Sequence, residues 1–138
     1  QFSQNISGSS FRLTLPVGKL RGAGPNPAPV VIRSSFIGLH NAYNLAAAFG
    51  AVAALGHDPE AIARCFPDVP AVPGRLEPVG NDRLGVYVDY AHTPDALANV
   101  LRALRPLSDG TLWVVFGCGG DRDKGKRPEM AKVAAELA

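Results

Sequence analysis

Residues 84–116 read LGVYVDYAHTPDALANVLRALRPLSDGTLWVVF, and the order of the patterns within them decides the fold class. Residues 84–90 are rich in side chains that favour β-structure, and 111–116 form a continuous apolar run that is typical of a buried parallel strand. Between these runs, Thr93-Pro-Asp carries a helix start signal, and one apolar stripe follows at helical spacing: Leu97, Val100, Leu101 and Leu104. This strand–helix–strand order predicts a right-handed βαβ unit with parallel strands, and therefore an α/β fold.

Beyond this unit, a glycine-rich loop at 117–127 leads to a second helical stripe at Met130, Val133, Ala134 and Leu137. In an open parallel sheet, ligands bind beyond the carboxyl ends of the strands. Two polar segments, 89–93 and 117–127, follow the two predicted strands. If these strands are neighbours, both segments open onto one crevice, which is the best candidate for a binding site.

Each candidate in these segments has a structural and a functional reading. Asp89 is suited to accept hydrogen bonds from two ribose hydroxyls, or to cap nearby backbone N–H groups. His92 is suited to contact a phosphate or donate a proton, although a lone loop histidine is more often a surface or packing residue. The only histidine near Cys118 is His92, and no oxyanion arrangement is evident. We therefore interpret Cys118 as structural and not as a nucleophile.

The loop at 117–127 combines four glycines with four cations, which are Arg122, Lys124, Lys126 and Arg127. A cation cluster directly after a buried strand suits the capture of an anion, while the simpler alternative is a solvated charged loop. The spacing matches neither a Walker A loop nor GxGxxG.

The first half of the chain has a different pattern. Residues 11–15 alternate apolar and polar side chains, and Val30 begins a second short strand running towards Gly38, so we expect an antiparallel tail of a larger sheet. A loop rich in proline and glycine separates them at 16–29.

Residues 41–55 then form an Ala- and Leu-rich segment, with Gly56 placed as its C′ residue. This segment is apolar on nearly every face, which predicts a buried helix. Asn41 and Asn44 share one face at its start, where they either cap the helix or read the edge of a base.

Asp58-Pro-Glu predicts the start of another helix, which should end before Pro67. The proline-rich stretch at 67–74 reads as a stiff linker, and we place a domain boundary near Val72.

Composition excludes several classes of protein. The chain has 138 residues with 14 Lys and Arg against 12 Asp and Glu, so it carries no charge stripe for nucleic acid or for a membrane surface. Its richest apolar stretch, at 45–55, is shorter than a bilayer span, and no signal peptide opens it. Two cysteines make no disulfide framework and suggest a reducing compartment. Both ends look cut, so we expect an internal piece of a longer protein that is inactive alone.

Four stretches together resemble the Mur ligases, the ATP-dependent amide-forming enzymes of peptidoglycan synthesis. They are HNAYNLAAA at 40–48, VPGRLE at 72–77, VDYAHTPD at 88–95 and VFGCGGDRDKGKRP at 115–128. Among family members, the similarity is greatest to the ligases that add the third residue of the stem peptide to UDP-N-acetylmuramoyl-L-Ala-D-Glu. The GCGGDRD form favours diaminopimelate over lysine as that residue.

The resemblance implies that 1–71 are the end of a central, P-loop-type ATP-binding domain and 72–138 the first βαβα of a Rossmann-like carboxy-terminal domain. It implies ATP and Mg²⁺ as cofactors, an acyl-phosphate intermediate and a bacterial cytoplasmic location, with the oligomeric state left open. Closure of a hinge between the two domains would assemble the site.

The resemblance also assigns residues by position. Asn41, Asn44, Arg75, Asp89 and His92 match residues that contact the nucleotide, Asp89 through the ribose and Arg75 from the hinge. Arg122 matches the arginine that holds the carboxylate of the incoming amino acid. The P-loop, the carbamylated lysine and the metal ligands of the family belong upstream, so no catalytic or metal-binding residue is assigned within these 138 residues.

Two alternatives remain open. One is another ligase of the superfamily, of the folylpolyglutamate or cyanophycin type, although DYAHTP at 89–94 argues against it. The other is a non-catalytic nucleotide-binding module, which an upstream GxxGK[ST] loop would exclude.

Overall fold

The computed structural model describes residues 1–15, 28–80, 84–120 and 123–138. Most of the loop expected at 16–29 and the candidate Arg122 lie outside the described residues. The chain divides into two compact units, Gln1–Ala71 and Val72–Ala138.

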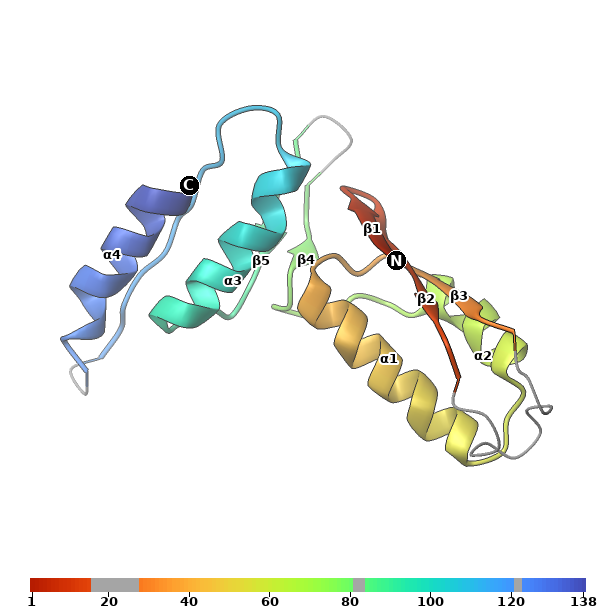
Figure 1. Ribbon diagram of the computed structural model, residues 1–138. Helices are drawn as coiled ribbons and strands as arrows, with labels where there is room; N and C mark the ends of the chain where they lie inside the picture. The colour runs from red at the N-terminus through yellow and green to blue at the C-terminus, as the bar shows by residue number, and fades with distance from the viewer. Residues whose placement is uncertain (16–27, 81–83, 121–122) are drawn as a thin grey trace. The chain divides into compact units, whose positions relative to one another are not determined.

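The first unit contains a three-stranded antiparallel sheet in the order β1–β2–β3 (Figure 1), formed by β1 (Phe2–Asn5), β2 (Gly8–Leu13) and β3 (Val30–Ser34). The two expected strands are confirmed, although each ends earlier than the sequence pattern indicated. A tight turn joins β1 to Gly8, the first residue of β2, which has φ of 143° and lies so close to the Ser34 carbonyl oxygen that a Cβ atom there would clash, so this position requires glycine.

Two helices complete this unit, α1 (Leu39–Ala54) and α2 (Pro59–Cys65), and a short 3₁₀ turn η1 (Phe66–Asp68) follows. As expected, Gly56 adopts φ of 95° directly after the end of α1. Asp58 caps α2, because its Oδ2 accepts a hydrogen bond of 2.8 Å from the Ala61 N–H. That helix ends before Pro67, also as expected.

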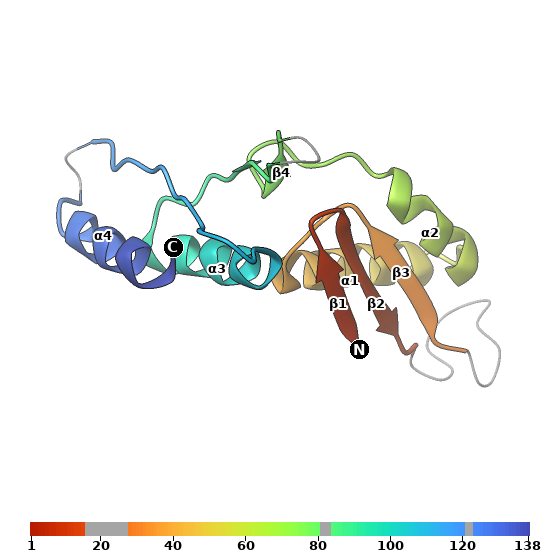
Figure 2. The same cartoon turned by 90° about the horizontal axis from the view of Figure 1, so that it is seen from above.

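The core of the first unit lies between the sheet and the helices, with α1 running along one face of the sheet (Figure 2). It is built by side chains from β2, β3 and the segment after β2, from every third or fourth position of α1, and from α2 and η1: Phe11, Leu15, Ile32, Ala42, Leu45, Phe49, Ala53, Ile62 and Phe66. Tyr43 and Val52 of α1 are 69% and 38% exposed. The expectation that α1 is buried on nearly every face is therefore wrong for this chain, because the described residues cover only its sheet-facing side.

The second unit is built mainly from two helices, α3 (Pro94–Leu104) and α4 (Lys126–Leu137), with a 3₁₀ turn η2 (Arg105–Leu107) after α3. Thr93 caps α3 as expected, since its Oγ1 accepts a hydrogen bond of 3.2 Å from the Ala96 N–H. The two predicted apolar stripes meet in one cluster centred on Leu97, Leu101 and Met130.

The strand expected at 84–90 is shorter than the sequence pattern indicated. Only β5 (Tyr87–Val88) forms a ladder, and it pairs antiparallel with β4 (Glu77–Pro78). Among the described residues no parallel pair forms, so the predicted parallel pairing is wrong within this chain.

The segment 111–116 also differs from the expectation of a buried strand. It enters no strand ladder among the described residues, and its side chains alternate between two environments. Leu112 and Val114 pack on the helix cluster, whereas Trp113 and Val115 are 87% and 99% exposed. A parallel strand is buried on both faces only when helices cover both, and in this unit the helices cover one.

No helix within the described ranges combines the length and apolar character that a bilayer crossing needs.

Candidate functional site

The segment Val72–Glu77 folds into a turn that presents Arg75. Pro73 and Gly74 occupy its two central positions, Gly74 has φ of 68°, and the Arg75 N–H donates to the Val72 carbonyl at 3.1 Å. A proline followed by a glycine with positive φ is the pattern of a type II turn. The Arg75 side chain is exposed.

The residue after Arg75 is held in an uncommon conformation. Leu76 has φ of 46°, and it is the one described non-glycine residue with a positive φ. A left-handed conformation costs an L-residue about 1–2 kcal/mol, so other contacts must hold it. The Leu76 side chain is only 3% exposed, and its N–H donates to Asp89 Oδ2 at 2.9 Å.

Asp89 has both of its oxygens engaged with backbone groups. Oδ2 accepts from Leu76, and Oδ1 accepts from the Ala91 N–H at 2.8 Å. The structural reading of Asp89 is therefore confirmed. The functional reading stays a prediction that fits the geometry, because an ionised carboxylate accepts about four hydrogen bonds and two of these positions are taken.

His92 lies three residues further on, at the exposed start of α3. Its Nδ1 is 3.1 Å from the Tyr90 carbonyl oxygen, and its ring meets the Tyr90 ring edge-on with centroids 5.3 Å apart. A carbonyl only accepts, so this contact is a hydrogen bond when Nδ1 carries the proton. The Nε2 atom of that tautomer can then accept a hydrogen bond.

Both polar segments predicted to face one crevice do line a common cleft of about 570 Å³ in the second unit. Asp89 and His92 contribute from one segment, and Gly117, Gly119 and Lys126 contribute from the other. Apolar side chains of α3 and of 112–116 form the rest of its wall. The expected crevice is thus confirmed, although the strands that lead to it do not pair.

The glycine-rich loop uses some of its polar groups to hold itself together. Arg127 donates through Nη2 to the Gly120 carbonyl at 2.8 Å, and the Lys126 N–H donates to Asp123 Oδ1 at 3.2 Å. Cys118 packs in the helix cluster, with its Sγ 3.5 Å from Met130 Sδ, which agrees with its structural interpretation. Anion capture by this loop stays a prediction, since Arg122 lies outside the described residues.

The structure places Asn41 and Asn44 in the first unit, at the start of α1. Asn41 is buried and donates through Nδ2 to the Ile37 carbonyl at 2.9 Å, and Asn44 donates to Asn41 Oδ1 at 3.4 Å. Neither side chain is the N-cap, which is Gly38 and has no side-chain hydrogen bond. The capping interpretation is therefore wrong in detail, and Asn44 remains exposed.

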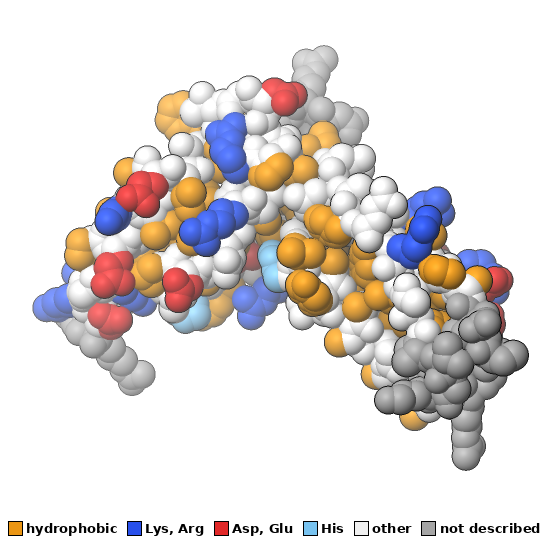
Figure 3. Space-filling view, viewed as in Figure 1, with side chains coloured by type: hydrophobic (Ala, Val, Ile, Leu, Met, Phe, Trp, Pro, Cys, Tyr) orange, Lys and Arg blue, Asp and Glu red, His pale blue; other side chains and the backbone are white. Residues whose placement is uncertain are grey.

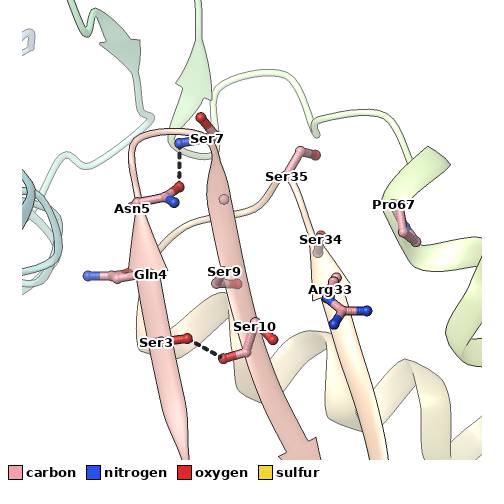
Figure 4. Close-up of a pocket in the computed structure, with 11 residues that line it drawn as sticks. Ser3, Gln4, Asn5, Ser7, Ser9, Ser10, Arg33, Ser34, Ser35 and Pro67 are labelled. Atoms are coloured by element: carbon pink, nitrogen blue, oxygen red, sulfur yellow. Dashed lines mark hydrogen bonds between the residues drawn. The ribbon is translucent and has the colours of Figure 1, made fainter.

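The first unit also contains a shallow pocket of about 450 Å³ that holds none of the predicted residues (Figure 4). Hydroxyl groups dominate its lining, and Ser10 pairs there with Arg33 on the neighbouring strand. The Ser9 hydroxyl is buried and has no hydrogen-bond partner among the residues that the structure describes.

The electrostatic setting of the described residues is mixed in sign. On the face shown in Figure 3, basic and acidic side chains are interspersed. Burial raises the pKa of the Tyr87 phenol above its usual value of 10.0. Among the described residues, no three His, Cys, Asp or Glu side chains are grouped as metal ligands.

Sequence reasoning missed Glu77, whose carboxylate contacts the same turn as Asp89. Its Oε2 accepts a hydrogen bond of 2.8 Å from the Gly74 N–H. The sequence contained a weak signal, since Glu77 belongs to VPGRLE, but the contact depends on the conformation of the turn.

Comparison with known proteins supplies the family. The profile described as "Mur ligase, glutamate ligase domain" matches residues 74–138. A diaminopimelate ligase of Trichormus variabilis, named as acting on UDP-N-acetylmuramoyl-L-alanyl-D-glutamate, is 53% identical over 112 residues. That match covers 79% of this chain and 23% of the relative.

Two further matches extend along the chain. The ligase of the same name from Thermosynechococcus vestitus is 45% identical over 139 aligned positions, covering 99% of this chain and 27% of its own length. A solved structure of a ligase of that name superposes with a TM-score of 0.69 at 36% identity, covering 100% of this chain and 26% of its own. The chain spans about a quarter of these relatives. The fold class expected from the sequence is confirmed, and the chain belongs to the Mur ligase family.

Proposed function

We propose that the full-length protein containing this chain is an ATP-dependent ligase that joins meso-diaminopimelate to UDP-N-acetylmuramoyl-L-Ala-D-Glu. The observation that carries this proposal is the 45% identity to a ligase of that name along 99% of the chain. We assign 1–71 to the end of the central ATP-binding domain and 72–138 to the start of the carboxy-terminal domain. A bacterial cytoplasmic location follows from the same assignment.

The proposed reaction proceeds in two steps. The D-Glu side-chain carboxylate attacks the γ-phosphorus of ATP, and ADP leaves. The amine of the incoming amino acid then attacks the acyl carbon, and the tetrahedral intermediate collapses by expelling phosphate. Phosphorylation replaces a poor leaving group by a good one, which is the purpose of the first step.

The residues of this chain would bind and orient rather than react. Asp89 has free acceptor positions for ribose hydroxyls, and the Arg75 guanidinium makes no hydrogen bond or ion pair with any described residue. Asn41, Asn44 and His92 are proposed as further nucleotide contacts. Arg122 is proposed to bind the carboxylate of the amino acid through its guanidinium fork. Mg²⁺ is proposed as the ion that neutralises phosphate charge, with ligands assigned to no residue here.

Product formation by the purified full-length protein tests the proposal. We expect phosphate release that requires both the UDP-muramoyl dipeptide and diaminopimelate, with the tripeptide product seen by mass spectrometry. Lysine in place of diaminopimelate is the matched control and should support much slower release. Release with a folate or polyamide acceptor would assign a different ligase, and ATP binding without turnover under any acceptor would leave only a nucleotide-binding module.

A further inference from the structure

The turn that carries Arg75 is fixed at its backbone, while the arginine side chain bonds to none of the described residues. Gly74 is held on both sides: its N–H donates to Glu77 Oε2 at 2.8 Å, and its carbonyl accepts from the Tyr90 N–H at 2.8 Å. On the other side of Arg75, Leu76 is tied to Asp89. The exposed Arg75 guanidinium therefore projects from a backbone that is anchored immediately before and after it.

Two carboxylates on different segments share this task. Asp89 comes from the segment after β5, and Glu77 is the first residue of β4, which pairs with β5 through Glu77 and Val88. Glu77 thus belongs to the β4–β5 ladder and also accepts a hydrogen bond from Gly74, which lies three residues earlier in the turn. A charged acceptor forms a stronger hydrogen bond to an N–H group than a neutral one does.

The conformation that these bonds hold is one the backbone would not keep unaided. Arg75 stands between Gly74 at φ of 68° and Leu76 at φ of 46°. Residues in sparsely populated regions persist only where their surroundings over-determine them, and such strain gathers at ligand-binding sites. Asp89 holds Leu76 in this conformation, and Glu77 holds Gly74 on the other side of Arg75, so the two carboxylates together fix the direction in which the Arg75 side chain leaves the turn.

We propose that Glu77 is a positioning residue, whose hydrogen bond to the Gly74 N–H holds the 72–77 turn in the shape that directs Arg75 to a nucleotide phosphate. This inference rests on the proposed function, because it takes ATP as the ligand of Arg75. The benefit is pre-organisation: a guanidinium on a fixed backbone loses less conformational freedom when it binds.

The test compares Glu77→Ala with Glu77→Gln in the full-length protein. Glutamine keeps an oxygen that can accept from Gly74, whereas alanine removes the acceptor. We expect Glu77→Ala to raise the dissociation constant for ATP, measured by calorimetry, by about tenfold, the loss expected for one hydrogen bond to a charged group. Glu77→Gln should lose clearly less affinity than Glu77→Ala, because the amide oxygen still accepts from Gly74, although a neutral acceptor bonds more weakly than a charged one. Glu136→Ala is the matched control, because Glu136 is exposed and, within the described part of the chain, pairs with Lys132 alone at 3.9 Å.

Amide hydrogen exchange of the 72–77 segment gives a second readout that a general loss of stability would not reproduce. We expect faster exchange there in Glu77→Ala, with exchange in α3 and α4 unchanged. Unchanged ATP affinity in Glu77→Ala, or an equal loss in Glu77→Gln, would overturn the positioning role while the proposed function stands. If Glu77→Ala fails to fold, Glu77→Asp replaces it, since its shorter side chain withdraws the acceptor. A parent protein that binds no ATP would overturn both.

Discussion

At the scale of single residues, the Asp89 carboxylate stabilises the fold and is also proposed to bind the nucleotide. Asp89 accepts two backbone N–H groups from two different parts of the second unit. Asp89→Ala leaves both donors without an acceptor, and we expect a loss of about 2 kcal/mol in the free energy of unfolding, since Asp89 is half-buried. Urea unfolding followed by circular dichroism measures it.

The matched control for that substitution is Asp109→Ala, because Asp109 is exposed and is not part of this network. A change within about 0.5 kcal/mol is expected there. If both variants unfold at the same urea concentration as the parent, the Asp89 hydrogen bonds contribute nothing to stability.

Tyr87 links stability to alkaline pH. Burial raises the pKa of its phenol in the folded chain above 10.0, so as pH rises the unfolded chain gives up this proton first. The contribution of Tyr87 is therefore complete below pH 10 and is lost as pH rises through the folded pKa. Unfolding midpoints in urea at pH 9 and pH 11 should fall less for Tyr87→Phe than for the parent. Equal declines in the two proteins would contradict this.

At the scale of elements, the helices of the second unit begin differently. Thr93 caps α3 with its own side chain, while the N-cap of α4 is Gly125, and the Lys126 N–H donates instead to Asp123 Oδ1 at 3.2 Å. Thr93→Ala should lower the free energy of unfolding by about 1 kcal/mol, and Thr93→Ser should restore most of it, since serine offers the same acceptor. Denaturant unfolding of the three proteins tests this, and a serine variant as unstable as alanine would refute the capping role.

Helix signals were predictable from the sequence because they are local. Asp58 and Thr93 cap helices within three residues of themselves, and the stripe from Leu97 to Leu104 needs only helical spacing. The β1 strand, FSQN, was missed because its four residues carry a single apolar side chain. The burial of 111–116 was predicted wrongly, because burial depends on a second layer and not on the segment alone.

The candidate site was predictable in its residues but not in its construction. Asp89 and His92 were identified from their position after a strand, and the cleft does collect them. Leucine rarely adopts positive φ, so nothing in the sequence indicated the conformation of Leu76 or the need for Glu77 to hold the turn. Hydrogen bonds from a side chain to a distant backbone group depend on the three-dimensional course of the chain, which local sequence patterns do not indicate.

At the scale of the whole molecule, two separate cores should respond separately to mutation. Phe49 belongs to the core of the first unit and Met130 to that of the second, and each is almost fully buried. Phe49→Ala should cost about 3–5 kcal/mol and Met130→Ala about 2–5 kcal/mol. Residue-resolved hydrogen exchange should show each loss confined to its own unit. Loss of protection in both units from either variant would show that they unfold together.

The alternation along 111–116 also has a spectroscopic consequence. Trp113 is the single tryptophan of this chain and is 87% exposed. The fluorescence of the 138-residue chain, excited at the red edge of the indole band, therefore reports on one surface alone. We expect emission typical of hydrated indole and full quenching by acrylamide. A blue-shifted emission that acrylamide does not quench would mean that Trp113 is covered. The fluorescence of Trp113 therefore measures whether the outer side of 111–116 is exposed to water.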